Sequence, residues 1–143
     1  MTTYVPHTTV SKALARFGIV LAGVAAALMV WVLAVGVETP RTPAVGGAPP
    51  SPLTAPEVLV AALVAGLVGW AALAVLERLT VRAVSVWRTL ATTVFLLSLG
   101  GPLTGDDVSI ASRVALVVMH VAVAAVVIPL LPLADSSSSE GLR

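Results

Sequence analysis

Four long apolar segments dominate the hydrophobic pattern of the chain, at residues 17–37, 58–76, 84–100 and 111–131. The first two contain no charged residue, and the other two contain one arginine each, near their start. At about 1.5 Å of rise per residue, a helix of roughly 20 residues crosses a hydrocarbon core of about 30 Å. The pattern therefore predicts four transmembrane helices.

The segments between these helices are predicted to be short or irregular. Residues 38–56 hold most of the chain's ten prolines, so neither helix nor sheet is expected to propagate there, and an extended outer linker is predicted. Thr54 and Glu57 have the spacing of a capping box at the start of the second helix. Gly100-Gly101-Pro102 is typical of a helix stop, and residues 104–109, with Asp106 and Asp107, form a short polar turn.

A single membrane domain over residues 11–134 is expected, with disordered tails at 1–10 and 135–143. Residues 17–37 also resemble a signal peptide, since Lys12 and Arg16 precede them and Ala34-Val35-Gly36 has the small residues of a cleavage site. Signal h-regions are about 7–15 residues long, and this one is longer. We therefore expect a retained helix.

The basic residues predict an orientation. Two of the eight Lys and Arg residues lie on the predicted outer side: Arg41 in the connection before the second segment, and Arg113 at the start of the fourth. The others lie in the two tails and at the hinge between the second and third helices: Lys12, Arg16, Arg78, Arg82, Arg88 and Arg143. Basic residues near span ends stay cytoplasmic. The predicted fold class is an all-α integral membrane four-helix bundle, antiparallel and up-down, with both termini cytoplasmic.

Small residues recur at helical spacing in the first two segments. Ala61, Ala65 and Gly69, flanked by Ala62 and Gly66, would allow close approach of another helix. A similar stripe in the first segment consists of Gly18, Ala22 and Ala26. The alternative is an alanine-rich composition without a packing role.

His120 is the one ionisable residue deep in a predicted span, about 12 Å from the outer end near Ser112 by helical rise. Ser85, Thr89, Thr92 and Thr93 share a face of the third helix, which a simple arrangement turns toward His120 and Arg113. Two interpretations are open: a proton relay or ligand, as intramembrane ionisable residues often are, or a neutral imidazole donating to a threonine hydroxyl or to a carbonyl one turn earlier. A haem would need a second deep histidine, from another copy.

A second candidate site is the cluster of Glu77, Arg78, Arg82 and Arg88 at the inner surface. Clustered arginines bind the phosphates of anionic lipid headgroups. The alternative is a determinant of topology, with Glu77 paired to Arg82 or Arg88. Arg88 is expected to reach the headgroups, with Trp87 beside it as an interfacial anchor.

Composition narrows the function classes. With 58% apolar and 10% charged residues, a net charge of +1 and no cysteine, the chain offers no surface for nucleic acid and no thiol chemistry. No catalytic motif is present, and no enzyme activity, metal or cofactor is expected. Small four-helix drug/proton antiporters need a glutamate in the first helix, and residues 17–37 contain none.

The chain resembles an uncharacterised actinobacterial family of four-span membrane proteins of unknown function. The matching residues extend over the last three spans: Leu76-Glu77-Arg78-Leu79-Thr80, Arg82, Val86-Trp87, Leu97-Ser98-Leu99-Gly100-Gly101-Pro102-Leu103, Ala111-Ser112-Arg113, Met119-His120 and Val127-Ile128-Pro129. The resemblance implies a bacterial plasma membrane and supplies no activity.

Two functions are therefore considered. The first is a non-enzymatic structural or accessory subunit that packs in the bilayer against a second copy or another membrane protein. The second is a small transporter or channel-like carrier that uses His120 and the hydroxyl face of the third helix.

Overall fold

A computed structural model describes residues 7–44, 49–104 and 108–135 of the chain. In chain order its elements are α1 (His7–Val35), β1 (Arg41–Thr42), β2 (Ser51–Pro52), α2 (Ala55–Leu79), α3 (Ala83–Ser98), α4 (Gly100–Thr104), α5 (Ile110–Leu130) and a 3₁₀ turn η1 (Leu131–Asp135). Four segments are long and apolar enough to cross a membrane: Val10–Val35, Ala55–Leu79, Ala83–Thr104 and Ile110–Ala134. The four predicted apolar segments lie within or closely overlap these helices.

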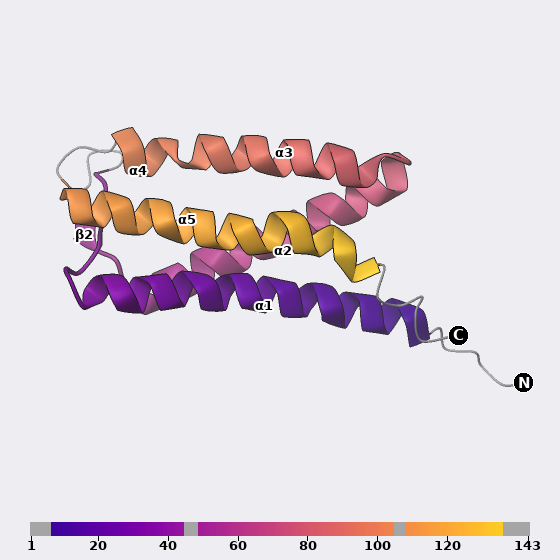
Figure 1. Ribbon diagram of the computed structural model, residues 1–143, viewed down its shortest axis with the longest axis horizontal. Coiled ribbons are helices and arrows are strands. Elements are labelled where there is room, and N and C mark those ends of the chain that lie inside the picture. Colours follow the sequence, from indigo (N-terminus) through magenta and orange to yellow (C-terminus); the bar gives the residue numbers. More distant parts are fainter. Residues whose placement is uncertain (1–6, 45–48, 105–107, 136–143) are drawn as a thin grey trace, which may run out of the picture.

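In Figure 1, α1, α5 and α3 lie side by side, with α5 between the other two. Behind them, α2 runs obliquely from the β-strand end, where it lies near α1, to the opposite end, where it joins α3. The start of α1, the α2–α3 connection and η1 lie at one end of the molecule, which we call the basic end. The strands and α4 lie at the other, which we call the loop end (Figure 1).

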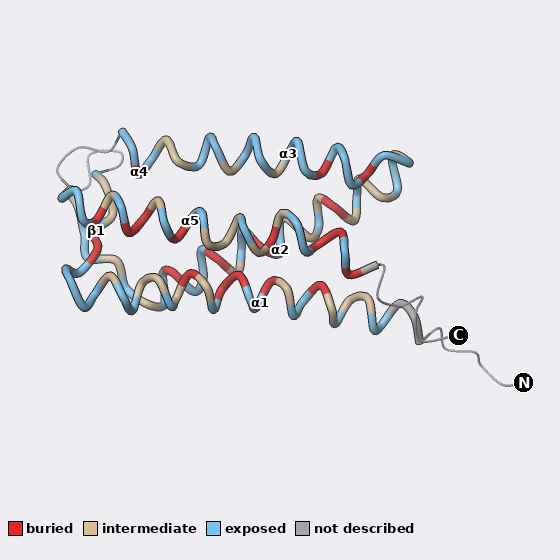
Figure 2. Tube along the Cα trace, in the orientation of Figure 1, coloured by how far each residue is buried: buried red, intermediate tan, exposed pale blue. Residues whose placement is uncertain are grey.

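Burial is uneven across the helices. Figure 2 shows that α3 is exposed along most of its length and buried only near its start. Its buried residues are Ala83 and Trp87, and its span is the least buried of the four. The helix therefore depends on contacts at the basic end for its attachment to the others.

The start of α1 differs from the sequence-based prediction, whereas the start of α2 agrees with it. Residues 7–10, predicted to belong to a disordered tail, form the first turn of α1. Pro6 directly precedes this turn, and proline is tolerated at a helix start, where its missing N–H would be unpaired anyway. The capping interaction at α2 is present, since Glu57 Oε2 accepts from the Thr54 backbone N–H at 2.7 Å and from its hydroxyl at 2.8 Å.

Gly100-Gly101-Pro102 does not end the third span, contrary to the prediction. Pro102 has no N–H for the Ser98 carbonyl, so the helix is interrupted at Leu99. A new turn, α4, then begins at Gly100, and Leu103 N–H donates to the Leu99 carbonyl at 3.0 Å. Proline is accepted here because it lies in the first turn of α4. Asp106 and Asp107 of the predicted polar turn lie outside the described residues.

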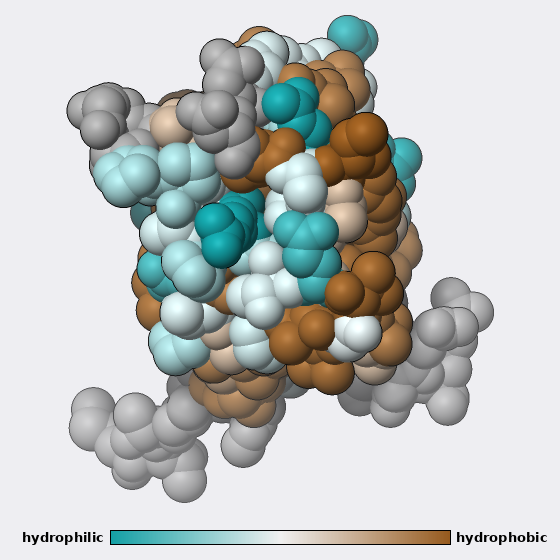
Figure 3. Space-filling model, turned by 90° about the vertical axis from the view of Figure 1, so that its left-hand side faces the viewer, coloured by the Kyte–Doolittle hydropathy of each residue, from teal (hydrophilic) through white to brown (hydrophobic). Residues whose placement is uncertain are grey.

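The proline-rich connection forms a small antiparallel strand pair, although no sheet was expected there. Arg41 pairs with Pro52 and Thr42 with Ser51; proline is tolerated because a two-stranded pair has only edge strands. Two further bonds attach this hairpin to the helices: Arg41 N–H donates to Ser112 Oγ at 3.2 Å, and Trp31 Nε1 donates to the Leu53 carbonyl at 2.9 Å. Seen from the loop end, hydrophilic residues gather over the middle of the face (Figure 3).

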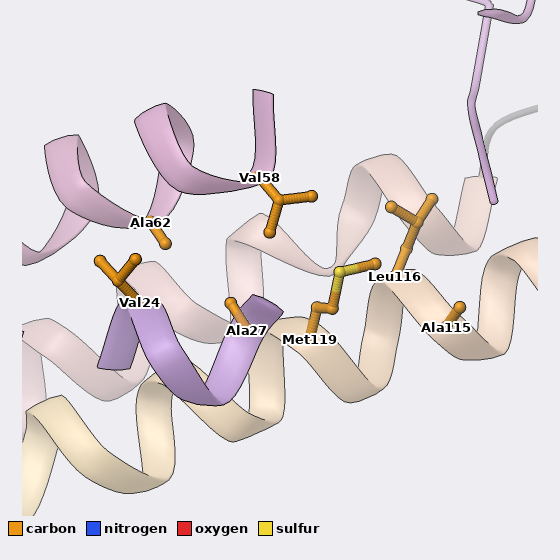
Figure 4. Packing of buried hydrophobic residues seen from close by; sticks show 7 residues of the cluster. All are labelled: Val24, Ala27, Val58, Ala62, Ala115, Leu116 and Met119. Carbon is orange, nitrogen blue, oxygen red and sulfur yellow. The ribbon is translucent and has the colours of Figure 1, made fainter. Parts of the chain in front are cut away.

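The core consists of two apolar clusters. The first joins α1, α2 and α5 toward the loop end, and Figure 4 shows its side chains converging from the three helices. The second lies toward the basic end and comprises Leu73, Trp87, Val127 and Leu131. The long helices thus share no single central core: α3 joins only the second cluster.

Only part of the predicted small-residue packing is used between helices. On α2, Gly66 is buried against α1, where an added Cβ would lie 2.7 Å from Val20 Cγ1. On α1 the predicted stripe of Gly18, Ala22 and Ala26 is not the packed face: Gly18 and Ala22 are exposed, and Gly18 has no heavy atom within 4 Å of an added Cβ.

Replacing Gly66 by leucine is expected to separate α1 from α2. Because Val20 occupies the space that a side chain would need, overpacking should cost about 1–3 kcal/mol. Gly18→Leu makes the same change on an exposed face of a helix and should alter stability by less than about 0.5 kcal/mol. Unfolding midpoints in one detergent measure both variants, and equal shifts would contradict the packing described here.

Candidate functional site

A groove of about 450 Å³ opens sideways between α2 and α3, with α5 behind it. Its lining is almost entirely apolar. On α2 most of the wall residues are small and include Ala61, Ala65 and Gly69 of the predicted small-residue face. The polar side chains among its lining residues are Glu57, Ser98 and His120. We call this feature the lateral groove.

Trp87 closes the lateral groove toward the basic end. Its side chain is 4% exposed, and its Nε1 donates to the Ile128 carbonyl of α5 at 3.2 Å. An added Cβ on Gly69 would lie 3.1 Å from the end of the indole ring. An alanine in place of Gly69 would make a tight contact with the indole ring. Trp87 thus packs between α2 and α5. The prediction that it anchors the chain at the membrane interface is wrong.

His120 lies half-buried in the wall of the lateral groove, close to the middle of the span Ile110–Ala134. Its Nδ1 is 2.7 Å from the Leu116 carbonyl of the preceding turn. A carbonyl oxygen only accepts, so Nδ1 carries the proton and donates. This contact is the one expected for an imidazole that bonds within its own helix. In a neutral ring the other nitrogen, Nε2, is then an acceptor.

Thr92 and Thr93 do not face His120, contrary to the arrangement predicted from the sequence. Both are exposed, as are Ser85 and Thr89, on the side of α3 away from the bundle. The Thr89 hydroxyl donates to the Ser85 carbonyl at 3.2 Å, and that of Thr93 to the Thr89 carbonyl at 2.9 Å. The rotation of α3 is set by Trp87, which must point inward. Ser98, which the sequence did not single out, is the hydroxyl of α3 that lines the groove.

Arg113 belongs to the loop end rather than to the lateral groove. Its guanidinium donates to the Leu103 carbonyl at 3.0 Å, which connects the start of α5 to α4. By helical rise it lies about 10 Å from His120 along α5, and it is not among the groove-lining residues. Arg113 and His120 therefore do not form one site.

The cluster at the basic end is built differently from the prediction. Glu77 forms a two-pronged ion pair with Arg16 of α1, and Lys12 Nζ lies 3.8 Å from the same carboxylate. The pairing of Glu77 with Arg82 or Arg88 is therefore wrong: Arg78, Arg82 and Arg88 are exposed. The Arg16 side chain is only 3% exposed and that of Glu77 is 25% exposed, so this pair is a partly buried connection between α1 and α2.

The positions of these residues in the sequence indicate this ion pair, which the prediction missed. Glu77 is the one acidic residue at the hinge, and Lys12 and Arg16 lie one helical turn apart at the start of the first helix. If both segments end at the same side of the membrane, the carboxylate and the two cations meet.

Within the described part of the chain, no group of three or more His, Asp or Glu side chains is placed to hold a metal ion.

Four apolar helices of this length define the class of protein: the chain is a multi-pass membrane protein. Its family is also defined. The chain belongs to the family described as "Family of unknown function (DUF6069)", whose model matches residues 7–137. No curated protein and no solved structure matches it.

Removing the charge of Glu77 is expected to destabilise the fold. Breaking a buried ion pair costs about 3–5 kcal/mol, and Glu77→Gln should cost about 2–3 kcal/mol because its side chain is 25% exposed. Arg78→Gln, a change of charge at the next, exposed position, is the control and should cost less than about 0.5 kcal/mol. Reversible unfolding in mixed micelles measures both, and a neutral Glu77→Gln would contradict the role of the pair.

Proposed function

We propose that the chain is a non-enzymatic accessory subunit of a bacterial plasma membrane, held against a second copy or another membrane protein. The observation that carries this proposal is the exposed hydroxyl face of α3. The proposal includes an up-down antiparallel arrangement in which the basic end, and with it both termini, is cytoplasmic.

The charges support this orientation. Lys12, Arg16, Arg78, Arg82 and Arg88 all belong to the basic end of the molecule, where α1 starts and α2 meets α3. Basic residues near span ends are retained on the cytoplasmic side. The exposed arginines at this end can also contact anionic headgroups, which is the lipid interpretation of the cluster.

The exposed face of α3 supports association with another helix. Lipid provides no hydrophobic drive for helix association, so membrane helices associate through close packing and polar contacts. Ser85, Thr89, Thr92 and Thr93 form a row of hydroxyls on a helix that contacts its own bundle mainly at one end. The Thr89 and Thr93 protons bond carbonyls of their own helix, so a second helix placed against this row would donate to the hydroxyl oxygens, which lipid tails cannot do.

The transporter hypothesis receives less support from the geometry. It requires a polar pathway to His120, whereas the lateral groove that reaches His120 is apolar and opens sideways. The hydroxyl face of α3 lies on the opposite side of that helix. A carrier for ions or small polar solutes would need His120 and the hydroxyls of α3 to line the same path.

Site-specific photocrosslinking in native membranes tests the accessory-subunit proposal. A benzophenone side chain at Leu96, which is 59% exposed one turn after Thr92, should form a discrete protein adduct. The same group at Met29, which is 67% exposed on α1, is the control and should react mainly with lipid. Mass spectrometry of the adduct distinguishes a second copy from another protein.

The hydroxyls provide the second part of this test. Thr89→Val and Thr93→Val keep side-chain shape and remove the polar groups, so together they should reduce the Leu96 adduct severalfold. Because interhelical hydrogen bonds in membranes average about 0.6 kcal/mol each, complete loss is not expected. Absence of a protein adduct at Leu96, or equal adducts at Leu96 and Met29, would overturn the proposal.

A further inference from the structure

In the lateral groove, His120 presents a ring nitrogen, Nε2, for which the described part of the chain gives no hydrogen-bond partner. Glu57 Oε2 accepts from the backbone N–H and from the hydroxyl of Thr54, and the Ser98 hydroxyl donates to the Phe95 carbonyl at 2.7 Å. His120 Nδ1 donates to Leu116, which leaves Nε2 as an acceptor. Among the described residues, the structure gives Nε2 no donor. An acceptor in apolar surroundings without a partner is costly.

The depth of His120 restricts what can supply the donor. By helical rise it lies about 15 Å from Ile110, which is half of a hydrocarbon core of about 30 Å. Water is scarce at this depth, and the headgroups of glycerol lipids stay at the interface. The donor must therefore belong to a molecule that is apolar enough to enter the hydrocarbon with its polar group.

The walls next to His120 favour a flat ring. Phe95 on α3 and Met119 on α5 both line the groove, and aromatic and thioether side chains pack favourably on aromatic rings. Opposite them, the small side chains of Ala61 and Ala65 leave the space open. The groove is open toward the bilayer between α2 and α3, so an apolar tail can remain in lipid.

We propose that the lateral groove binds the reduced form of a lipid quinone, a hydroquinone with an apolar tail, whose phenolic hydroxyl donates to His120 Nε2. The hydroquinone has the required donor, whereas the oxidised quinone has only carbonyl acceptors. The groove therefore discriminates between the two forms by hydrogen bonding alone. This inference goes beyond the proposed function and does not depend on the α3 face.

Equilibrium binding to the full chain in lipid nanodiscs tests the proposal. The probe is radiolabelled decylubiquinol, kept reduced under anaerobic conditions, with empty nanodiscs as the blank. Two matched ligands lack the donor: decylubiquinone, which is oxidised, and the dimethyl ether of the hydroquinone, which is reduced. Saturable binding is expected for the hydroquinone, and loss of one hydrogen bond should weaken both controls about tenfold.

Variants assign the binding to the groove. His120→Phe removes the acceptor at similar size and should make the hydroquinone bind about as weakly as its dimethyl ether. His120→Gln retains an acceptor oxygen and should recover part of the difference. Ala65→Phe fills the groove and should abolish binding of all three ligands, whereas Met29→Phe, on the exposed face of α1, should leave it unchanged.

Any of the following results would overturn the proposal. Equal affinity for the hydroquinone and its dimethyl ether shows that no donor is recognised. Unchanged binding in Ala65→Phe places the ligand elsewhere. Recovery of a phospholipid or a long-chain alcohol, rather than a hydroquinone, from the purified wild type but not from Ala65→Phe would assign the groove to another occupant. None of these results bears on the photocrosslinks at Leu96.

Discussion

The structure depends on a constraint that the bilayer imposes: apolar side chains gain little by leaving lipid for one another. Four apolar helices therefore associate only where specific contacts connect them. At the basic end the partly buried pair of Arg16 and Glu77 joins α1 to α2, and Trp87 joins α3 to α2 and α5. Toward the loop end, Trp31 connects α1 to the hairpin through the Leu53 carbonyl.

The uneven distribution of these contacts explains both candidate surfaces. Because α3 is attached mainly through Trp87 at the basic end, it diverges from α2 toward the loop end, and the lateral groove opens between them. The same attachment directs one face of α3 inward and leaves its hydroxyl face toward the surroundings. Because few contacts hold α3, the protein exposes the hydroxyls of α3 on one side and the acceptor nitrogen Nε2 of His120 in the lateral groove on another.

Much of the fold follows from local sequence. The length and composition of the apolar segments suffice for four helices, and the Thr54–Glu57 capping interaction needs only residues three apart. The rotation of α3 was not predictable in this way. Hydroxyls bonded to their own helix carbonyls, as in Thr89 and Thr93, can face lipid at little cost, so polarity did not reveal which face is inward. Partners distant in sequence, such as Arg16 and Glu77, depend on the assembled helices.

The most direct test of the account is the side of the membrane on which each end lies. The chain has no cysteine, so single cysteines can be introduced at Thr39, exposed at the loop end, and at Val81, exposed in the α2–α3 connection. A membrane-impermeant maleimide applied to intact cells should label Thr39→Cys at once and Val81→Cys only after permeabilisation. Labelling of both cysteines from the same side would contradict the four-span arrangement.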